Sequence, residues 1–273
     1  MEINLEKQVL GMQSNKQQLE EKGYIILKNF FDKEYIETLR HKAEDIFKIQ
    51  FKHFGYEGDF KENMIRLFNE HESVFINCGK IIQTGLLELY KLPLEDKLIN
   101  IVKDLGVEFP NLCTRPVLYF NHPKLAKEII YYKTPPHQDW LSMESSMDSL
   151  VVWVPLVDVN KENGSIILYP GTHKLGPLSF KSNGGFAEVE IVGEGIQPKL
   201  EIGDIAIFST LLIHASGDIS TPCTLPNKFW YDLIFIFLLR KYFIITIQSI
   251  IRINRIKILF IIGSVNKKII LIN

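Results

Sequence analysis

The segment from residue 135 to residue 140 reads PPHQDW and places a histidine and an aspartate two positions apart. In an extended chain, side chains alternate between two faces, so His137 and Asp139 would project to the same side. An imidazole nitrogen and a carboxylate oxygen could then approach one metal ion from adjacent positions. Pro135 and Pro136 favour an extended backbone before the triplet. A His-X-Asp triplet alone is not specific, so its meaning depends on the rest of the chain.

A third candidate ligand follows 75 residues after Asp139. The stretch GDIAIFSTLLIHASG reads as a turn and an apolar strand that ends in His214, before a loop that contains glycine. Two histidines and one carboxylate on one face, with coordination positions left open, are the ligand set of non-haem Fe(II) oxygenases. The alternative is that His214 only occupies the end of a strand. Gln138 would point away from its two neighbours, so we do not expect it to be a ligand.

The elements that must position these residues are short strands. From residue 110 onward, short runs rich in Val, Ile, Tyr and Phe alternate with turns that contain Gly, Pro, Asn or charged residues. Six or more such strands with long loops between them indicate an antiparallel sandwich or barrel rather than βαβ units. The runs are RPVLYF, IIYYK, DSLVVWVPLVDV, GSIILYP, AEVEIVG and GDIAIFSTLLIH.

The first 109 residues are predicted to be mostly helical after a short strand in GYIILKNFF. Asp32 is a plausible N-cap for a helix to about Ile49, with one apolar face and with Lys42, Glu44 and Lys48 in solvent. Further helices are expected from Lys61 to about Leu105, with a break near Leu92-Pro93. We expect the histidines of this region to be surface or packing residues rather than ligands; they are His41, His53 and His71.

Composition excludes several other classes of protein. The chain has 273 residues, 46% hydrophobic and 23% charged, which suits a soluble globular protein with a sizeable core. A net charge of −1 predicts no general attraction to nucleic acid or membrane. Three widely spaced cysteines match neither a disulfide framework nor a cysteine-based zinc site. No apolar targeting segment is visible at the N-terminus, so we expect a cytoplasmic protein.

The order of four motifs carries a resemblance. HQD, VVWVPL, ENGSIILYPGTHKLG and LEIGDIAIFSTLLIHASGDIS follow one another as in the phytanoyl-CoA dioxygenase family of Fe(II)/2-oxoglutarate oxygenases. The early GYIILKNFFDKEYIETLR also resembles that family's first strand and helix. The resemblance covers roughly residues 20 to 222 and is far more specific than any single motif.

The resemblance implies an α+β fold, with a double-stranded β-helix (jelly-roll, cupin-like) core and the N-terminal helices packed on one sheet. It implies that His137, Asp139 and His214 hold Fe(II), with 2-oxoglutarate as cosubstrate and O2 and a small molecule as the other reactants. Trp153 in VVWVPL and Ser216 match family positions near the cosubstrate, although a tryptophan there could equally be a core residue. Because Asp139 is present, hydroxylation is favoured over the halogenation carried out by relatives that have Ala or Gly at this position.

One expected family residue is absent. An Arg should stand about ten to twelve positions after the second histidine and pair with the distal carboxylate of 2-oxoglutarate. Thr224, Leu225 and Pro226 occupy those positions, and Lys228 is the nearest cation. Prolines at 222 and 226 also disfavour a strand there.

The charge and composition change sharply after residue 228. Residues 229–273 contain 15 Ile, no Ala, Glu or Pro, and seven basic residues against the single acid Asp232. We therefore divide the chain into a dioxygenase-like domain (helical 1–109, β core 110–228, without its last strands) and an anomalous Ile-rich basic tail (229–273). The tail's longest apolar run, Leu233 to Leu239, is too short for a membrane-spanning helix.

The resulting functional hypothesis is an Fe(II)- and 2-oxoglutarate-dependent dioxygenase that hydroxylates an unactivated C–H bond and is impaired by the missing Arg. Two alternatives stay open. One is a catalytically inactive dioxygenase-like binding module, which the missing Arg and the tail favour. The other is a cupin-like metalloenzyme that does not use 2-oxoglutarate.

Overall fold

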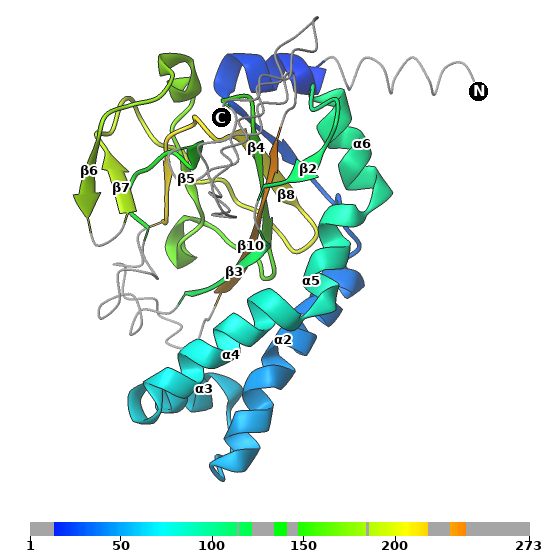
Figure 1. Ribbon diagram of the computed structural model, residues 1–273, viewed down its shortest axis with the longest axis vertical. Coiled ribbons are helices and arrows are strands. Elements are labelled where there is room, and N and C mark those ends of the chain that lie inside the picture. The colour runs from blue at the N-terminus through cyan, green and yellow to red at the C-terminus, as the bar shows by residue number, and fades with distance from the viewer. Residues whose placement is uncertain are drawn as a thin grey trace, which may run out of the picture.

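The computed structural model describes residues 14–113, 115–121, 134–140, 147–183, 186–217 and 230–238. Helices lie on one side of a main antiparallel sheet, and short strands form a second sheet on its other side. Figure 1 shows this second sheet at the left and the helices at the right and below. The architecture is the predicted α+β arrangement of a helical layer on a β core. The predicted strand IIYYK falls outside the described residues.

The N-terminal elements follow the sequence pattern closely. Residues 14–22 are helical, β1 runs from Tyr24 to Leu27, and α2 runs from Lys33 to His53. The carboxylate of Asp32 accepts from Glu34 N and caps α2, as predicted. The helix continues one turn beyond the expected end at Ile49. Glu44 was expected in solvent but is 8% exposed, because it lies on the covered face of α2, where Arg40 pairs with it at 3.0 Å.

Four more helices and a 3-10 turn complete the helical layer. These elements are α3 (Phe60–Glu70), α4 (Glu72–Gly85), α5 (Leu87–Lys91), η1 (Leu92–Leu94) and α6 (Asp96–Asp104). The predicted break near Leu92-Pro93 is confirmed as η1, since proline fits the start of a helical turn but not its interior. No helix among the described residues is long and apolar enough to cross a membrane.

The main sheet has the strand order β1-β8-β4-β10-β2, and β3 pairs with the same edge of β10 as β2 does. All of its pairs are antiparallel. Its members not yet placed are β2 (Asn111–Leu112), β3 (Val117–Asn121), β4 (Leu150–Pro155), β8 (Ile205–Ser209) and β10 (Trp230–Leu238).

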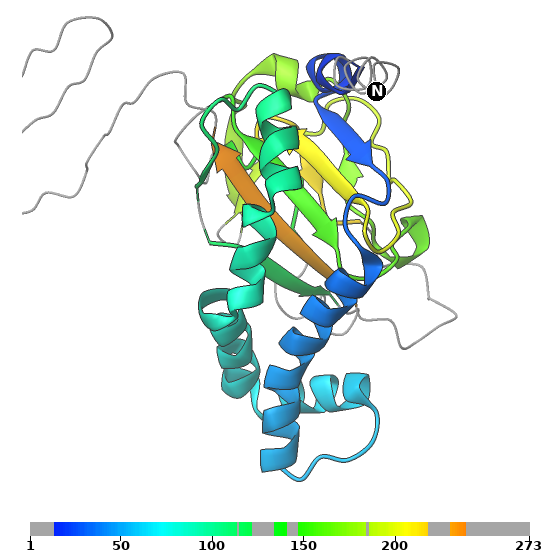
Figure 2. The same cartoon turned by 90° about the vertical axis from the view of Figure 1, so that its right-hand side faces the viewer.

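Alternating residues of β4 serve two separate cores. Leu150, Val152 and Val154 pack with the helices, whereas Val151 and Trp153 pack on the opposite face toward the second sheet. Figure 2 shows the helices crossing the outer face of the main sheet. Because both faces are covered, all six residues of β4 are buried, and the strand reads as a continuous apolar run.

The second sheet is built around the His-X-Asp segment. Its strands are β5 (Ile167–Leu168) paired with β9 (His214–Ala215), and β6 (Phe180–Asn183) paired with β7 (Phe186–Val189). His137 bridges both pairs, because it lies antiparallel to His214 on one side and to Glu188 on the other. The 3-10 turns η3 (Lys161–Asn163) and η4 (Thr172–Leu175) lie in the connections.

Strand β10 departs from the expected domain organisation. Trp230–Leu238 belongs to the range expected to lie outside the β core, yet it pairs with β4, β3 and β2 in the main sheet. WYDLIFIFL is rich in the β-branched and aromatic residues that favour strands. These nine residues take a place in the main sheet. The rest of the expected tail lies outside the described residues, and the division at residue 228 itself stays a prediction.

Candidate metal centre

Three predicted ligands from two distant segments converge between the two strand pairs of the second sheet. One carboxylate oxygen of Asp139 lies 3.3 Å from His137 Nε2, and the other lies 3.4 Å from His214 Nε2. One ligand atom from each residue can be chosen so that all three lie within 4.8 Å of one another. The side chains are 13%, 14% and 4% exposed for His137, Asp139 and His214, so the cluster is largely buried.

Backbone carbonyls determine which nitrogen of each imidazole faces the cluster. His137 Nδ1 lies 2.8 Å from Pro135 O, and His214 Nδ1 lies 3.1 Å from Leu212 O. A carbonyl can only accept a hydrogen bond, so both Nδ1 atoms carry the proton. Both Nε2 atoms are therefore left for the cluster, an arrangement found around most metal-bound histidines.

This arrangement directs electron pairs toward one point. With Nδ1 protonated, a neutral imidazole offers only an acceptor at Nε2, and an ionised carboxylate offers only acceptors. Asp139 Oδ2 is buried and has no hydrogen-bond partner. Three converging acceptors repel one another unless a proton or a cation lies between them. The donor set of two imidazoles and one carboxylate suits a divalent iron ion, so the residues present fit the metal that the sequence predicts.

The ionisation of the cluster shows how the charges balance without a metal. Burial opposes the charged form of Asp139, but His214 and His137 outweigh it and hold the pKa of this carboxyl well below its usual range. Burial also lowers the pKa of His137, yet the adjacent Asp139 raises it overall. Burial and the charge of His137 lower the pKa of His214. Without a metal, these shifts favour a second proton on the His137 ring beside the ionised Asp139.

Backbone pairing brings the two ligand segments together. His137 N donates to His214 O at 3.0 Å, and His214 N donates to His137 O at 3.1 Å. Behind the second histidine, the buried hydroxyl of Thr172 accepts from Ile213 N at 3.0 Å and donates to Tyr169 O at 2.7 Å. Thr172 belongs to the PGTHK motif, so this motif supports β9. Sequence reasoning did not assign this role to Thr172.

A family model described as phytanoyl-CoA dioxygenase (PhyH) matches residues 19–224, which is most of the chain. The chain belongs to the phytanoyl-CoA dioxygenase family. The family uses Fe(II) and 2-oxoglutarate. The resemblance expected from the four motifs is thus confirmed, and the match ends close to the point where the composition changes.

Curated relatives are about 25% identical to this chain over the aligned residues. Bovine peroxisomal phytanoyl-CoA dioxygenase is 25% identical over 233 residues, which cover 78% of this chain and 65% of the bovine protein. A probable phytanoyl-CoA dioxygenase of Caenorhabditis elegans is 24% identical over 214 residues, 72% of this chain and 67% of its own length. The chain thus spans about two thirds of the length of these relatives.

Solved structures of similar fold include two oxygenase-type proteins. The epimerase SnoN, in complex with Fe3+, alpha ketoglutarate and nogalamycin RO, matches with a TM-score of 0.57 at 16% identity, over 84% of each chain. The non-heme monooxygenase ThoJ matches with a TM-score of 0.56 at 14% identity, over 82% of this chain and 77% of its own. At these identities the likeness concerns the fold, and it confirms the predicted cupin-like α+β class.

The two residues expected near the cosubstrate of this PhyH-family chain lie in different settings. Trp153 is 3% exposed and packs on the inner face of the main sheet, in the same core cluster as Phe208. The ring of Phe208 lies 4.7 Å from that of His214, so this core reaches the metal ligands. The hydroxyl of Ser216 accepts from Thr134 N at 3.1 Å and helps join β9 to the His-X-Asp segment. The cosubstrate roles of Trp153 and Ser216 stay predictions.

The structure describes four further histidines, but not the positions where the family Arg was expected. Within the described ranges, the metal-binding cluster includes none of His41, His53, His71 and His173. His173 instead donates from Nε2 to Glu20 O at 3.1 Å and joins the PGTHK turn to the N-terminal helix. Positions 224–226, where the family Arg was expected, lie outside the described residues. The described strand β10 contains neither Arg nor Lys.

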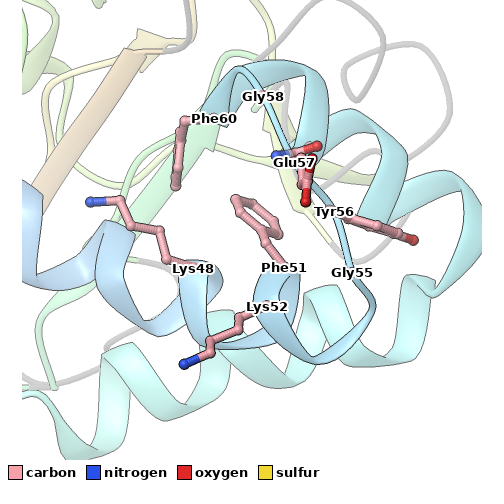
Figure 3. A pocket seen from close by; sticks show the side chains of 9 residues that line it. Lys48, Phe51, Lys52, Gly55, Tyr56, Glu57, Gly58 and Phe60 are labelled. Atoms are coloured by element: carbon pink, nitrogen blue, oxygen red, sulfur yellow. The ribbon is translucent and has the colours of Figure 1, made fainter.

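A surface pocket of about 390 Å³ lies elsewhere, between the end of α2 and the start of α3. Figure 3 shows Phe51 and Phe60 side by side in it, with Lys48 and Lys52 at its margin. The two rings are 5.4 Å apart. The pocket contains none of the three metal-ligand candidates and therefore forms no part of the candidate metal centre.

Proposed function

We propose that this chain is an Fe(II)- and 2-oxoglutarate-dependent dioxygenase that hydroxylates an unactivated C–H bond of a small-molecule or lipid-like substrate. The observation that carries the proposal is the convergence of His137 Nε2, His214 Nε2 and the Asp139 carboxylate on one point. Membership of the PhyH family supports the same reaction class. The co-reactants would be O2 and the small molecule, and we keep the cytoplasm as the expected compartment.

Each residue of the site has a definable task in this proposal. His137, Asp139 and His214 would hold the metal, and Fe(II) with 2-oxoglutarate, when bound, would activate O2, which is the oxidant of the reaction. The carbonyls of Pro135 and Leu212 keep each Nδ1 protonated, so each Nε2 is available as a ligand. The apolar core around Trp153 and Phe208 excludes water from the inner side of the site. We assign Trp153 and Ser216 to the cosubstrate side.

The test is to mix the protein with Fe(II) and 2-oxoglutarate without oxygen, record the visible spectrum, and then admit O2. The proposal predicts a metal-to-cosubstrate charge-transfer band and then succinate. If neither band nor succinate is found, the dioxygenase proposal is wrong. Fe(II)-dependent turnover without 2-oxoglutarate would instead support a cupin-like metalloenzyme.

A second candidate has its own supporting observation. Thr224, Leu225 and Pro226 stand where the family Arg is expected, and no cation in this stretch can pair in two places with a carboxylate. An inactive dioxygenase-like binding module would keep the metal and lose the cosubstrate. Fe(II) binding together with no measurable 2-oxoglutarate binding in equilibrium dialysis would favour this second function.

A further inference from the structure

Gln138 lies between two proposed metal ligands, and its side chain is fully buried. Its amide makes three hydrogen bonds, each to a backbone group. Nε2 donates to Leu211 O at 2.6 Å and to Gly176 O at 3.0 Å, and Oε1 accepts from Leu178 N at 2.9 Å. The amide thus uses both of its donors and its acceptor oxygen.

These bonds connect the His-X-Asp segment to two other parts of the site. Leu211 precedes His214 by three residues, so one bond links the two ligand segments on the side away from the metal. Gly176 and Leu178 follow the PGTHK turn and lead into the β6–β7 hairpin. That hairpin also holds the segment directly, since Val189 N donates to Pro136 O at 2.9 Å.

The short segment couples Gln138 to its neighbours. The side chains of His137 and Asp139 converge on His214, whereas the amide of Gln138 bonds to backbone groups elsewhere. A rotation of this short segment about its own axis would therefore move all three side chains together. Three hydrogen bonds on one face resist that rotation, so they also keep His137 Nε2 and the Asp139 carboxylate directed at His214.

We propose that Gln138 is a positioning residue, which sets the geometry of the metal ligands through hydrogen bonds on the side of the segment away from them. This inference rests on the proposed metal site. Residues that orient metal ligands without touching the metal typically contribute about 10–100-fold to metal affinity. A purely structural residue would lower stability without changing the affinity or the coordination geometry.

The experiment compares Gln138→Met with the wild-type chain. Methionine keeps the length of the side chain and removes all three hydrogen bonds. Gln197→Met is the matched control, because Gln197 Nε2 also donates to a backbone carbonyl, Ser165 O at 3.1 Å, and this carbonyl belongs to neither ligand segment. Co(II) serves as the probe, and the measurements are its dissociation constant by calorimetry, its visible d–d spectrum and the thermal unfolding midpoint of the metal-free protein.

We expect Gln138→Met to lose about 10–100-fold in Co(II) affinity and to show an altered d–d spectrum. Gln197→Met should bind Co(II) within about threefold of wild type. If Gln138→Met does not fold, Gln138→Glu, which keeps the oxygen that accepts from Leu178 N, is measured in the same way, with a loss of at least about tenfold expected.

Two results would overturn the inference, and they are distinguishable. If wild type binds Co(II) and the folded Gln138 variant binds it equally well with the same spectrum, the positioning role is wrong and the proposed metal site stands. If the wild-type chain binds no Co(II), the proposed function fails and the inference fails with it.

Discussion

At the scale of single residues, the candidate metal site brings one carboxylate and two imidazoles together, so its charge depends on protons or a metal ion between them. Asp139 Oδ2 is buried without a hydrogen-bond partner, between two imidazoles that direct Nε2 toward the carboxylate. Without a metal, the raised pKa of His137 favours a proton on this ring beside the carboxylate. With a metal, that proton must leave. Metal binding and protonation at this cluster therefore compete.

Replacement of Asp139 or of His214 by alanine should strongly weaken metal binding. We expect Asp139→Ala and His214→Ala to lower Co(II) affinity at least about 100-fold, because two remaining ligands hold the ion poorly. Isothermal titration at neutral pH measures this. His41→Ala is the control, since His41 is an exposed histidine on α2, and it should bind Co(II) as wild type does. Unchanged affinity in Asp139→Ala would mean that the ion binds elsewhere.

The pH dependence of metal binding follows from the raised pKa of His137. Below this pKa one proton must be displaced for each ion bound, so affinity should fall about tenfold for each pH unit. Above it, affinity should level off. Titrations with Co(II) between pH 5.5 and 8.5 would show this shape, and an affinity independent of pH over the same range would contradict it.

The stability of the metal-free protein should pass through a maximum near the ordinary histidine pKa of 6.5. The pKa of His214 is lowered by folding, so its contribution to stability is lost as pH falls below 6.5. The pKa of His137 is raised, so its contribution is lost as pH rises through the folded-state pKa. Thermal unfolding midpoints of metal-free wild type and of the double variant His137→Ala, His214→Ala, measured against pH, would separate this contribution from that of other groups.

At the scale of secondary-structure elements, buried polar residues fix how neighbouring segments meet. Asp204, 2% exposed, precedes β8 and binds the turn after β1. Its carboxylate accepts from Asn29 N at 2.8 Å, from Glu201 N at 2.8 Å and from Lys28 Nζ at 2.7 Å. Burial alone would raise its pKa, but these hydrogen bonds and the charge of Lys28 lower it overall. The carboxylate thus fixes the β1–β8 pairing at one end.

Asp204→Ala should lower the free energy of unfolding by about 2–4 kcal/mol, because it leaves two backbone N–H groups without their acceptor. Urea unfolding followed by circular dichroism measures the loss. Since the pKa of Asp204 is lowered by folding, the difference from wild type should shrink as pH falls below the ordinary value of 3.8. Asp45→Ala, which removes an exposed ion pair with Lys48, is the control and should cost less than about 1 kcal/mol.

At the scale of the whole molecule, β10 determines whether β4 has a partner strand on the side away from β8. It pairs with β4 on one side and with β3 and β2 on the other, so it separates β4 from the sheet edge. Every residue of β4 is buried. A chain without β10 would expose an apolar strand edge, which favours aggregation.

Truncation tests the place of β10 directly. A chain that ends at residue 224, where the family match stops, should lack a cooperative unfolding transition or aggregate, because β4 loses its partner. A chain that ends after Leu238 keeps the strand and should unfold as the full-length protein does. Size-exclusion chromatography and thermal unfolding compare the two. A folded monomer ending at residue 224 with an unchanged midpoint would show that β10 is dispensable.

The sequence alone was enough to predict what depends on local pattern and motif order. Helical periodicity and capping placed α2 and the break at η1, and alternation placed His137 and Asp139 on one face. Motif order pointed to His214 as the third ligand and to the PhyH family. The helix, its break and the family are confirmed, because each depends on neighbours along the chain or on several motifs in a fixed order. The role of His137, Asp139 and His214 as metal ligands stays a prediction.

Only the tertiary structure decided the rest, because it depends on contacts between segments that are far apart in the sequence. Glu44 is buried through its place on a covered helix face, Gln138 finds its partners around residues 176 and 211, and β10 finds its place between β4 and β3. Side-chain alternation predicts the direction in which Gln138 points, but it cannot supply the backbone groups that meet its amide. Those groups come from the segments around residues 176 to 178 and 211, which only the folding of the chain brings to the His-X-Asp pattern of the candidate metal centre.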